Sequence, residues 1–155
     1  MADAARTVQE RLRNRLASHY LSYEWTTEFD VGGTPVDVAG VDSDLVLLEL
    51  EWRRADPVDN TAKLFRHLAD GTLDAYGRVT VVQLFTAYYD LARGGVSSKR
   101  RNAEFVGERV ASSFDRVRYR GTTLPIDPPK RGGSLPDAWR DVVDETVDSL
   151  LLDDS

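Results

Sequence analysis

The feature that most constrains this sequence is an apolar, β-branched run at residues 45–52 that carries two glutamates. A shorter run at residues 35–39 precedes it, and a turn of Gly, Asp and Ser joins the two, which predicts an antiparallel hairpin. Side chains alternate between the faces of a strand, so Glu49 and Glu51 should share one face. The other face should carry Val46, Leu48, Leu50 and Trp52. Asp37 lies on the first strand, and three carboxylates are therefore expected near one another.

These carboxylates favour a cation site, because an ionised acid among apolar neighbours must be paired, protonated or bound to a metal. Ligand sets made only of oxygen suit hard cations such as Mg²⁺. Asp37 and Glu49 are candidate ligands for Mg²⁺ or Mn²⁺, and Glu10 is a candidate outer ligand. Two plainer alternatives stay open. One glutamate could reach solvent while the other pairs with Arg53 or Arg54, and Glu10 could be a solvated helix charge.

Length and composition describe one globular domain spanning residues 1–155, of which 41% are hydrophobic and 30% charged. The chain has no cysteine and two histidines, which excludes a disulfide scaffold and a thiolate zinc site. No apolar run suits a membrane span or a signal peptide, so a soluble, cytoplasmic protein with no membrane partner is expected. The net charge of −6 argues against nonspecific coating of nucleic acid, although a local basic face is compatible with it.

Hydrophobic periodicity predicts the order of the elements. We expect helices at 4–21, 60–70 and 97–113 and from Ser134 onward, and strands at 22–31, 35–39, 45–52, 78–87 and 116–124. Because a helix leads into the strand at 78–87, that strand should pair in parallel with the strand at 45–52 through a right-handed crossover. Its polar residue Gln83 is either a core amide or faces the same cleft as Glu49. The predicted fold is α/β (α+β), with a mixed central sheet flanked by helices.

Three groups of polar and basic residues are candidate contacts for nucleic acid. The predicted helix at 60–70 directly follows the glutamate strand and can lean over its end, while cations in the first turn of the helix at 97–113 oppose the macrodipole and suit phosphate. An arginine-rich strand is either an edge protected against aggregation or a phosphate-contact surface. A solvated polar surface is the alternative for the two helices. The groups are Asn60, Lys63, Arg66 and His67; Lys99, Arg100 and Arg101; and Arg116, Arg118 and Arg120.

The element order resembles the core of the PD-(D/E)xK nuclease superfamily, which has the restriction-endonuclease-like fold. The matching residues are Pro35-Val36-Asp37 on the second strand and Glu49-Leu50-Glu51 on the third, within a helix, three-strand meander, helix and strand (αβββαβ). The resemblance covers about residues 4–87 and leaves residues 88–155 as a C-terminal elaboration with an extra strand and a terminal helix. The lysine that ends the family motif is Glu51 here, and Lys63 stands where a lysine on the following helix replaces it in other members.

This resemblance implies metal-dependent hydrolysis of DNA phosphodiester bonds, in restriction and defence or in repair. Asp37 and Glu49 would hold Mg²⁺ or Mn²⁺, and Glu51 or Lys63 would orient or deprotonate the attacking water. A homodimer is expected, because cutting both strands usually needs two active sites. The implied DNA contacts are Asn60, Arg66, His67, Lys99, Arg100, Arg101, Arg118 and Arg120.

Two other functions stay open on the sequence alone. Loss of the motif lysine is compatible with a nuclease-fold protein that no longer cleaves and serves as a DNA-binding or assembly subunit. A small α/β protein with no nucleic-acid role is the third possibility, and it predicts arginines scattered over unrelated faces.

Overall fold

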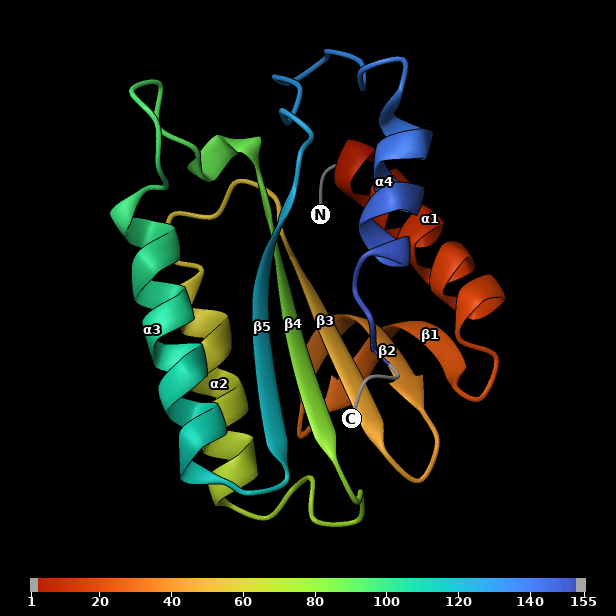
Figure 1. Cartoon of the computed structure of the whole chain (residues 1–155), viewed down its shortest axis with the longest axis vertical. Helices are drawn as coiled ribbons and strands as arrows, with labels where there is room; N and C mark the ends of the chain where they lie inside the picture. Colours follow the sequence, from red (N-terminus) through yellow and green to blue (C-terminus); the bar gives the residue numbers. More distant parts are fainter. Residues whose placement is uncertain (1–2, 153–155) are drawn as a thin grey trace.

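The computed structural model describes residues 3–152, which form helices on both faces of one mixed five-stranded sheet (Figure 1). In chain order, the elements are α1 (Asp3–His19), β1 (Glu24–Val31), β2 (Thr34–Val41), β3 (Leu45–Glu51), α2 (Val58–Ala69), β4 (Val79–Thr86), a 3₁₀ turn η1 (Ala87–Tyr89), α3 (Ser98–Ser113), β5 (Val117–Leu124) and α4 (Trp139–Asp148). The predicted α/β class with a mixed sheet is confirmed.

The strands lie in the sheet in the order in which they occur in the chain. The β1–β2 and β2–β3 pairs are antiparallel, whereas β3–β4 and β4–β5 are parallel. The parallel β3–β4 pair confirms the crossover predicted through the intervening helix. Both parallel pairs bring strand ends of the same polarity to one edge of the sheet.

Two hydrophobic layers cover the two faces of the sheet. Helices α1 and α4 lie side by side on one face, and α2 and α3 on the other (Figure 1). On α1 the residues Val8, Leu12 and Leu16, spaced four apart, are fully buried in the first layer, as their periodicity predicts. Leu64 and Leu68 of α2 belong to the second layer.

Strand β3 is buried on both faces and separates these two layers. Val46, Leu48 and Leu50 pack into the layer under α1 and α4, whereas Leu45 and Leu47 pack under α2 and α3. Alternation therefore places the glutamates of β3 on the α2 and α3 side. The prediction that Glu49 and Glu51 share one face, opposite Val46, Leu48 and Leu50, is confirmed, and Leu45 and Leu47 lie on the glutamate face as well.

Hydrophobicity predicts an inward face of α2 that includes Phe65 and excludes Asn60 and His67, and this part of the prediction is wrong. The helix begins at Val58 rather than residue 60, and it buries Asn60 and His67 while leaving Phe65 41% exposed. Hydrophobicity alone predicts that the Phe65 side chain faces the core. The carboxyl group of Glu51 is buried beneath the helix and accepts a hydrogen bond from the Asn60 amide, so this polar side chain is turned inward.

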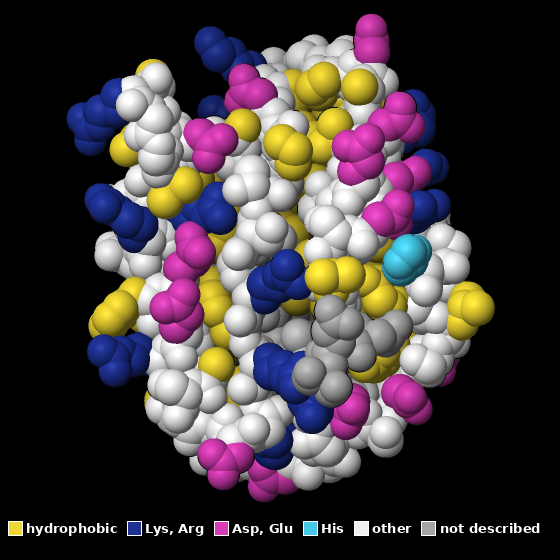
Figure 2. Space-filling model, viewed as in Figure 1, with side chains coloured by type: hydrophobic (Ala, Val, Ile, Leu, Met, Phe, Trp, Pro, Cys, Tyr) yellow, Lys and Arg dark blue, Asp and Glu magenta, His cyan; other side chains and the backbone are white. Residues whose placement is uncertain are grey.

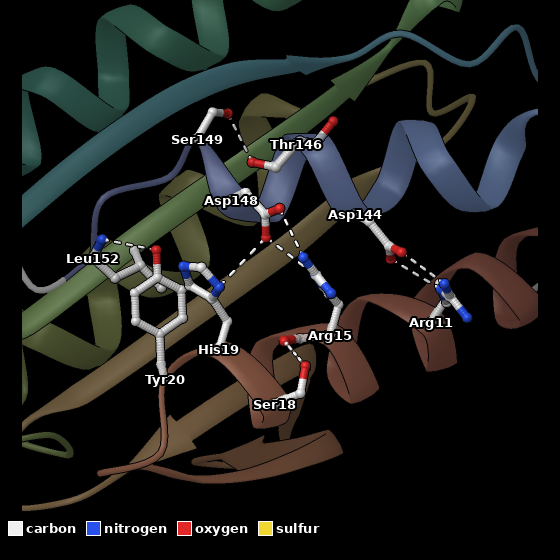
Figure 3. Close-up of polar contacts among 10 residues, drawn as sticks. All are labelled: Arg11, Arg15, Ser18, His19, Tyr20, Asp144, Thr146, Asp148, Ser149 and Leu152. Atoms are coloured by element: carbon white, nitrogen blue, oxygen red, sulfur yellow. Dashed lines mark hydrogen bonds and ion pairs between the residues drawn. The ribbon is translucent and has the colours of Figure 1, made fainter.

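Ion pairs join α1 to α4 (Figure 3). Arg11 and Arg15 each make paired hydrogen bonds, to Asp144 and Asp148 respectively, and the shorter of each pair is 2.7 Å. The apolar residues of α4 pack in the hydrophobic layer between α1, α4 and the sheet. Helix α4 begins at Trp139 rather than at Ser134. The exposed residues of α4 are charged, so this helix, one place where the C-terminal sequence could form the expected homodimer, presents no apolar face for it.

Gly107 of α3 packs directly against the ring of Tyr119, and a side chain there is expected to destabilise the protein. Alanine ordinarily stabilises a helix interior by about 1 kcal/mol relative to glycine. A Cβ on Gly107, however, would overlap the Tyr119 ring and disturb its 2.6 Å hydrogen bond to Gln83. Gly107→Ala should lower the free energy of unfolding in urea by about 1–3 kcal/mol. Asn102→Ala, at an exposed position of the same helix, is the control, and equal stability of the two variants would contradict this packing.

Candidate functional site

The site begins where β2 separates from β3. Backbone pairing between these strands runs from Val41 opposite Leu45 to Val38 opposite Leu48. At the next position the Asp37 carboxylate accepts a 2.7 Å hydrogen bond from the backbone N–H of Leu50. The side chain thus takes the place of a strand carbonyl, which fixes the orientation of Asp37.

Helix α1 also contacts Asp37, through the side chain of Gln9. Gln9 is buried, and its Nε2 donates to the backbone carbonyl of Asp37 at 2.6 Å and to Glu28 Oε1 at 3.0 Å. Glu10, the predicted outer ligand, is exposed on the neighbouring side of the helix. The helix therefore turns Gln9, and not Glu10, toward the acids.

Asp37 and Glu49 meet at this point, close enough for each carboxyl group to shift the pKa of the other. Burial, followed by the charges of Asp37 and Glu51, raises the pKa of Glu49 well above its usual value. Burial also raises the pKa of Asp37, although the Leu50 N–H opposes the shift. Glu49 is buried and Asp37 half-buried, and neighbouring carboxyl groups in such surroundings share a proton unless a cation neutralises them.

Glu51 lies beneath the pair and is fully buried, with 0% of its surface exposed. Its Oε1 accepts hydrogen bonds from Asn60 Nδ2 at 2.7 Å and Gln83 Nε2 at 3.2 Å, while its Oε2 has no hydrogen-bond partner within the part of the chain that the structure describes. Burial raises the pKa of Glu51 to about 7, against the opposing effects of the two amides and of Arg54. Glu51 is thus oriented inward by a polar network.

Gln83 belongs to the same buried network and is a core amide. Its Nε2 also lies 3.3 Å from the carbonyl of Pro57, and its Oε1 accepts a 2.6 Å hydrogen bond from the Tyr119 hydroxyl. Both ends of the amide therefore have partners, which settles the alternative left open by the sequence.

A cleft of about 540 Å³ opens over Asp37 and Glu49 at the carboxyl end of β3. Clefts at the carboxyl ends of strands are the usual binding places in sheets with parallel pairs. Basic residues of the cleft wall are Arg53, Arg54 and Lys63, so α2 does lean over the strand end as expected. The Lys63 ammonium lies 3.1 Å from Asp59 Oδ2.

Sequence reasoning missed Glu28, which also lines the cleft. The residue has φ +52°, in the left-handed region that is unfavourable for a glutamate. Thr27 pairs with Val38 and Phe29 with Val36, so residue 28 lies opposite Asp37. Counting back from the glycine turn that joins β1 to β2 would have found this position.

Several residues predicted to contact nucleic acid have partners inside the protein. Arg100 is only 8% exposed, and its guanidinium binds Glu104 and Thr123 at 2.7 Å each. Asn60 bonds Glu51, and His67 Nε2 lies 3.0 Å from the Thr34 hydroxyl. These contacts explain their orientation without a ligand.

The other predicted basic residues lie on separate elements. Arg120 donates to the backbone carbonyl of Leu150, and the Lys99 ammonium lies 5.7 Å from the centre of the Tyr88 ring. Arg66, Arg101 and Arg118 are exposed on α2, α3 and β5. Figure 2 shows basic and acidic side chains interleaved over the viewed face rather than one basic patch. Of the predicted groups, only Asn60 and Lys63 of α2 line the cleft, and its other basic residues, Arg53 and Arg54, come from the segment after β3.

The comparisons with known proteins give no relative from which to assign the site. The sequence matches no protein-family model and no curated protein. Within residues 3–152, no group of three or more His, Cys, Asp or Glu side chains is arranged to hold a metal ion. No helix in this same range is long and apolar enough to cross a membrane.

Proposed function

We propose that this chain is a Mg²⁺- or Mn²⁺-dependent DNA endonuclease with a restriction-endonuclease-like core formed by α1 to β4. The contact between the Asp37 and Glu49 carboxyl groups at the floor of a cleft carries this proposal. The order of elements around these residues is the one the family resemblance implies.

The donor set fits a hard divalent cation held by few protein ligands. Mg²⁺ commonly takes one or two carboxylates and completes its shell with water and substrate phosphate. Asp37 and Glu49 supply two carboxylates, and burial, the largest cause, raises the pKa of each, so a bound cation would stabilise their ionised forms. A metal bound there would polarise a phosphodiester and lower the pKa of a water molecule.

The chain's own residues hold this arrangement in place. The Leu50 N–H and Gln9 amide fix the side chain and backbone of Asp37, which preorganises one carboxylate. Lys63 lines the cleft and, released from Asp59, would orient the attacking water or the phosphate. We assign Glu51 a positioning role, because both of its polar contacts lie inside the protein.

A second candidate is a nuclease-fold protein that binds DNA without cleaving it. The presence of Glu51 at the motif's lysine position and the Lys63–Asp59 ion pair favour it. In that case the acid pair would contribute to metal-assisted DNA binding only.

Incubation of plasmid DNA with the purified protein separates these functions. We expect nicked or linear products with Mg²⁺ or Mn²⁺ and none with EDTA, while isothermal calorimetry detects binding of the metal. Metal binding without cleavage would support the second candidate. Absence of both would contradict the proposed function.

A further inference from the structure

Arg54 follows β3 and is held at the cleft through its backbone. Its N–H donates to the Tyr89 hydroxyl at 2.8 Å, and the same hydroxyl donates to the Arg54 carbonyl at 3.0 Å. Tyr89 is fully buried, with its ring 5.5 Å from that of Phe85 in an edge-on arrangement. One rigid side chain thus satisfies both polar groups of the Arg54 backbone.

The Arg54 side chain is oriented by a chain of polar groups that ends in the core. Its Nη1 donates to Asn60 Oδ1 at 2.7 Å, and Asn60 Nδ2 donates to Glu51 Oε1. Because Glu51 Oε1 is the acceptor in this bond, the amide nitrogen of Asn60 faces Glu51. The Asn60 oxygen is consequently turned toward Arg54. Glu51 therefore positions Arg54 through Asn60.

The guanidinium retains donors for a ligand. An arginine has five N–H donors in a planar fork, and a side-chain partner is seen for one of them in residues 3–152. Arg54 is exposed and lines the cleft with Asp37 and Glu49. Its charge lowers the pKa of both, yet no carboxylate in this range lies within ion-pair distance of it. By contrast, Arg11, Arg15 and Arg100 are paired with carboxylates.

We infer that Arg54 is a phosphate-binding residue of the cleft, and that Glu51 and Asn60 are the positioning residues that present its guanidinium. The planar fork suits two oxygens of one phosphate group. This inference deepens the proposed function by naming the residue that recognises the DNA backbone. The inference is tested by measuring DNA binding, whereas the proposed function is tested by measuring DNA cleavage.

Fluorescence anisotropy with a labelled DNA duplex tests this assignment, with Ca²⁺ replacing Mg²⁺. Arg54→Ala should weaken binding at least tenfold and reduce the magnitude of the salt slope by about one, as expected for one lost phosphate contact. Arg54→Lys should recover only part of the affinity, because a lysine lacks the fork. Arg93→Ala, exposed in the loop before α3, removes the same charge outside the cleft and is the control.

A double-mutant cycle tests the positioning role of Asn60. Asn60→Ala should weaken DNA binding about threefold in the wild type and have no further effect in Arg54→Ala, because its contribution passes through that side chain. Equal losses in both backgrounds would overturn the positioning role. Should Asn60→Ala fail to fold, the affinities of Arg54→Ala, Arg54→Lys and Arg93→Ala still decide whether Arg54 binds phosphate.

Inorganic phosphate serves as a second probe and identifies the source of the ligand group. Weaker binding of both probes by Arg54→Ala supports recognition of any phosphate group, and weaker binding of the duplex alone supports recognition of the backbone diester. The inference is overturned if Arg54→Ala and Arg93→Ala bind both probes with equal affinity, or if the wild type binds neither probe. Arg54-dependent binding without cleavage in Mg²⁺ or Mn²⁺ would refute the proposed function and leave the inference standing.

Discussion

Glu49→Gln is expected to abolish DNA cleavage while leaving the fold intact. On the proposed function, loss of this carboxylate removes one of two protein ligands and should lower the cleavage rate about a thousandfold, or about 4 kcal/mol of transition-state stabilisation. The amide of a glutamine can donate to Asp37, where the acid pair otherwise has to share a proton. The variant should therefore unfold at an equal or higher urea concentration than the wild type at pH 7.5. Rates are measured from plasmid cleavage in Mg²⁺.

The opposite signs of these two effects make the experiment informative. A core residue whose only role is packing would lose activity and stability together, whereas a functional acid held in an unfavourable environment loses activity and gains stability. Glu24→Gln, exposed on β1, is the matched control and should change neither quantity. Cleavage by Glu49→Gln within tenfold of the wild-type rate would contradict a role for this carboxylate.

The sequence pattern predicted the central part of the fold, namely the direction of the β3 side chains and the parallel pairing of β3 with β4. Alternation along residues 45–52 fixed which face carries Glu49 and Glu51, and the crossover rule fixed the parallel partner. The contact of Glu49 with Asp37 follows from two adjacent strands of one hairpin. Such short-range geometry is contained in the sequence pattern.

The surroundings of the acids depend on tertiary partners that periodicity does not encode. Hydrophobicity ranks Asn60 as an outer residue of α2, but the buried Glu51 needs a donor and turns this amide inward. Arg100 carries a charge and was assigned to phosphate, yet its guanidinium lies 4.9 Å from the centre of the Phe85 ring. Its partner Glu104 is four residues along the same helix, which is a pairing the sequence does display.

Without a divalent metal, the free energy of unfolding should fall as the pH rises from 5 to 8. The pKa of Glu51 is about 7 in the folded protein against 4.5 as its usual value, so the folded state binds more protons than the unfolded state across this range. Its contribution is fully present below pH 4.5 and is lost as the pH passes 7. The difference corresponds to about 3 kcal/mol, and the raised pKa values of Asp37 and Glu49 act in the same direction. Urea unfolding in EDTA at several pH values measures it.

Divalent metal should oppose this trend and offset much of the loss, because it takes the place of the protons on Asp37 and Glu49. A metal that binds only the folded state at a hundred times its dissociation constant adds about 2.7 kcal/mol. The gain should be large at pH 8 and small at pH 5, where protons compete for the carboxylates. Glu51→Gln should reduce the pH dependence in EDTA and retain the response to metal, since Asp37 and Glu49 remain. The exposed Asp70 and Asp148 have lowered pKa values, so their titration falls below this pH range. Stability that rises steadily from pH 5 to 8 in EDTA would show that the buried acids are neutralised by other means.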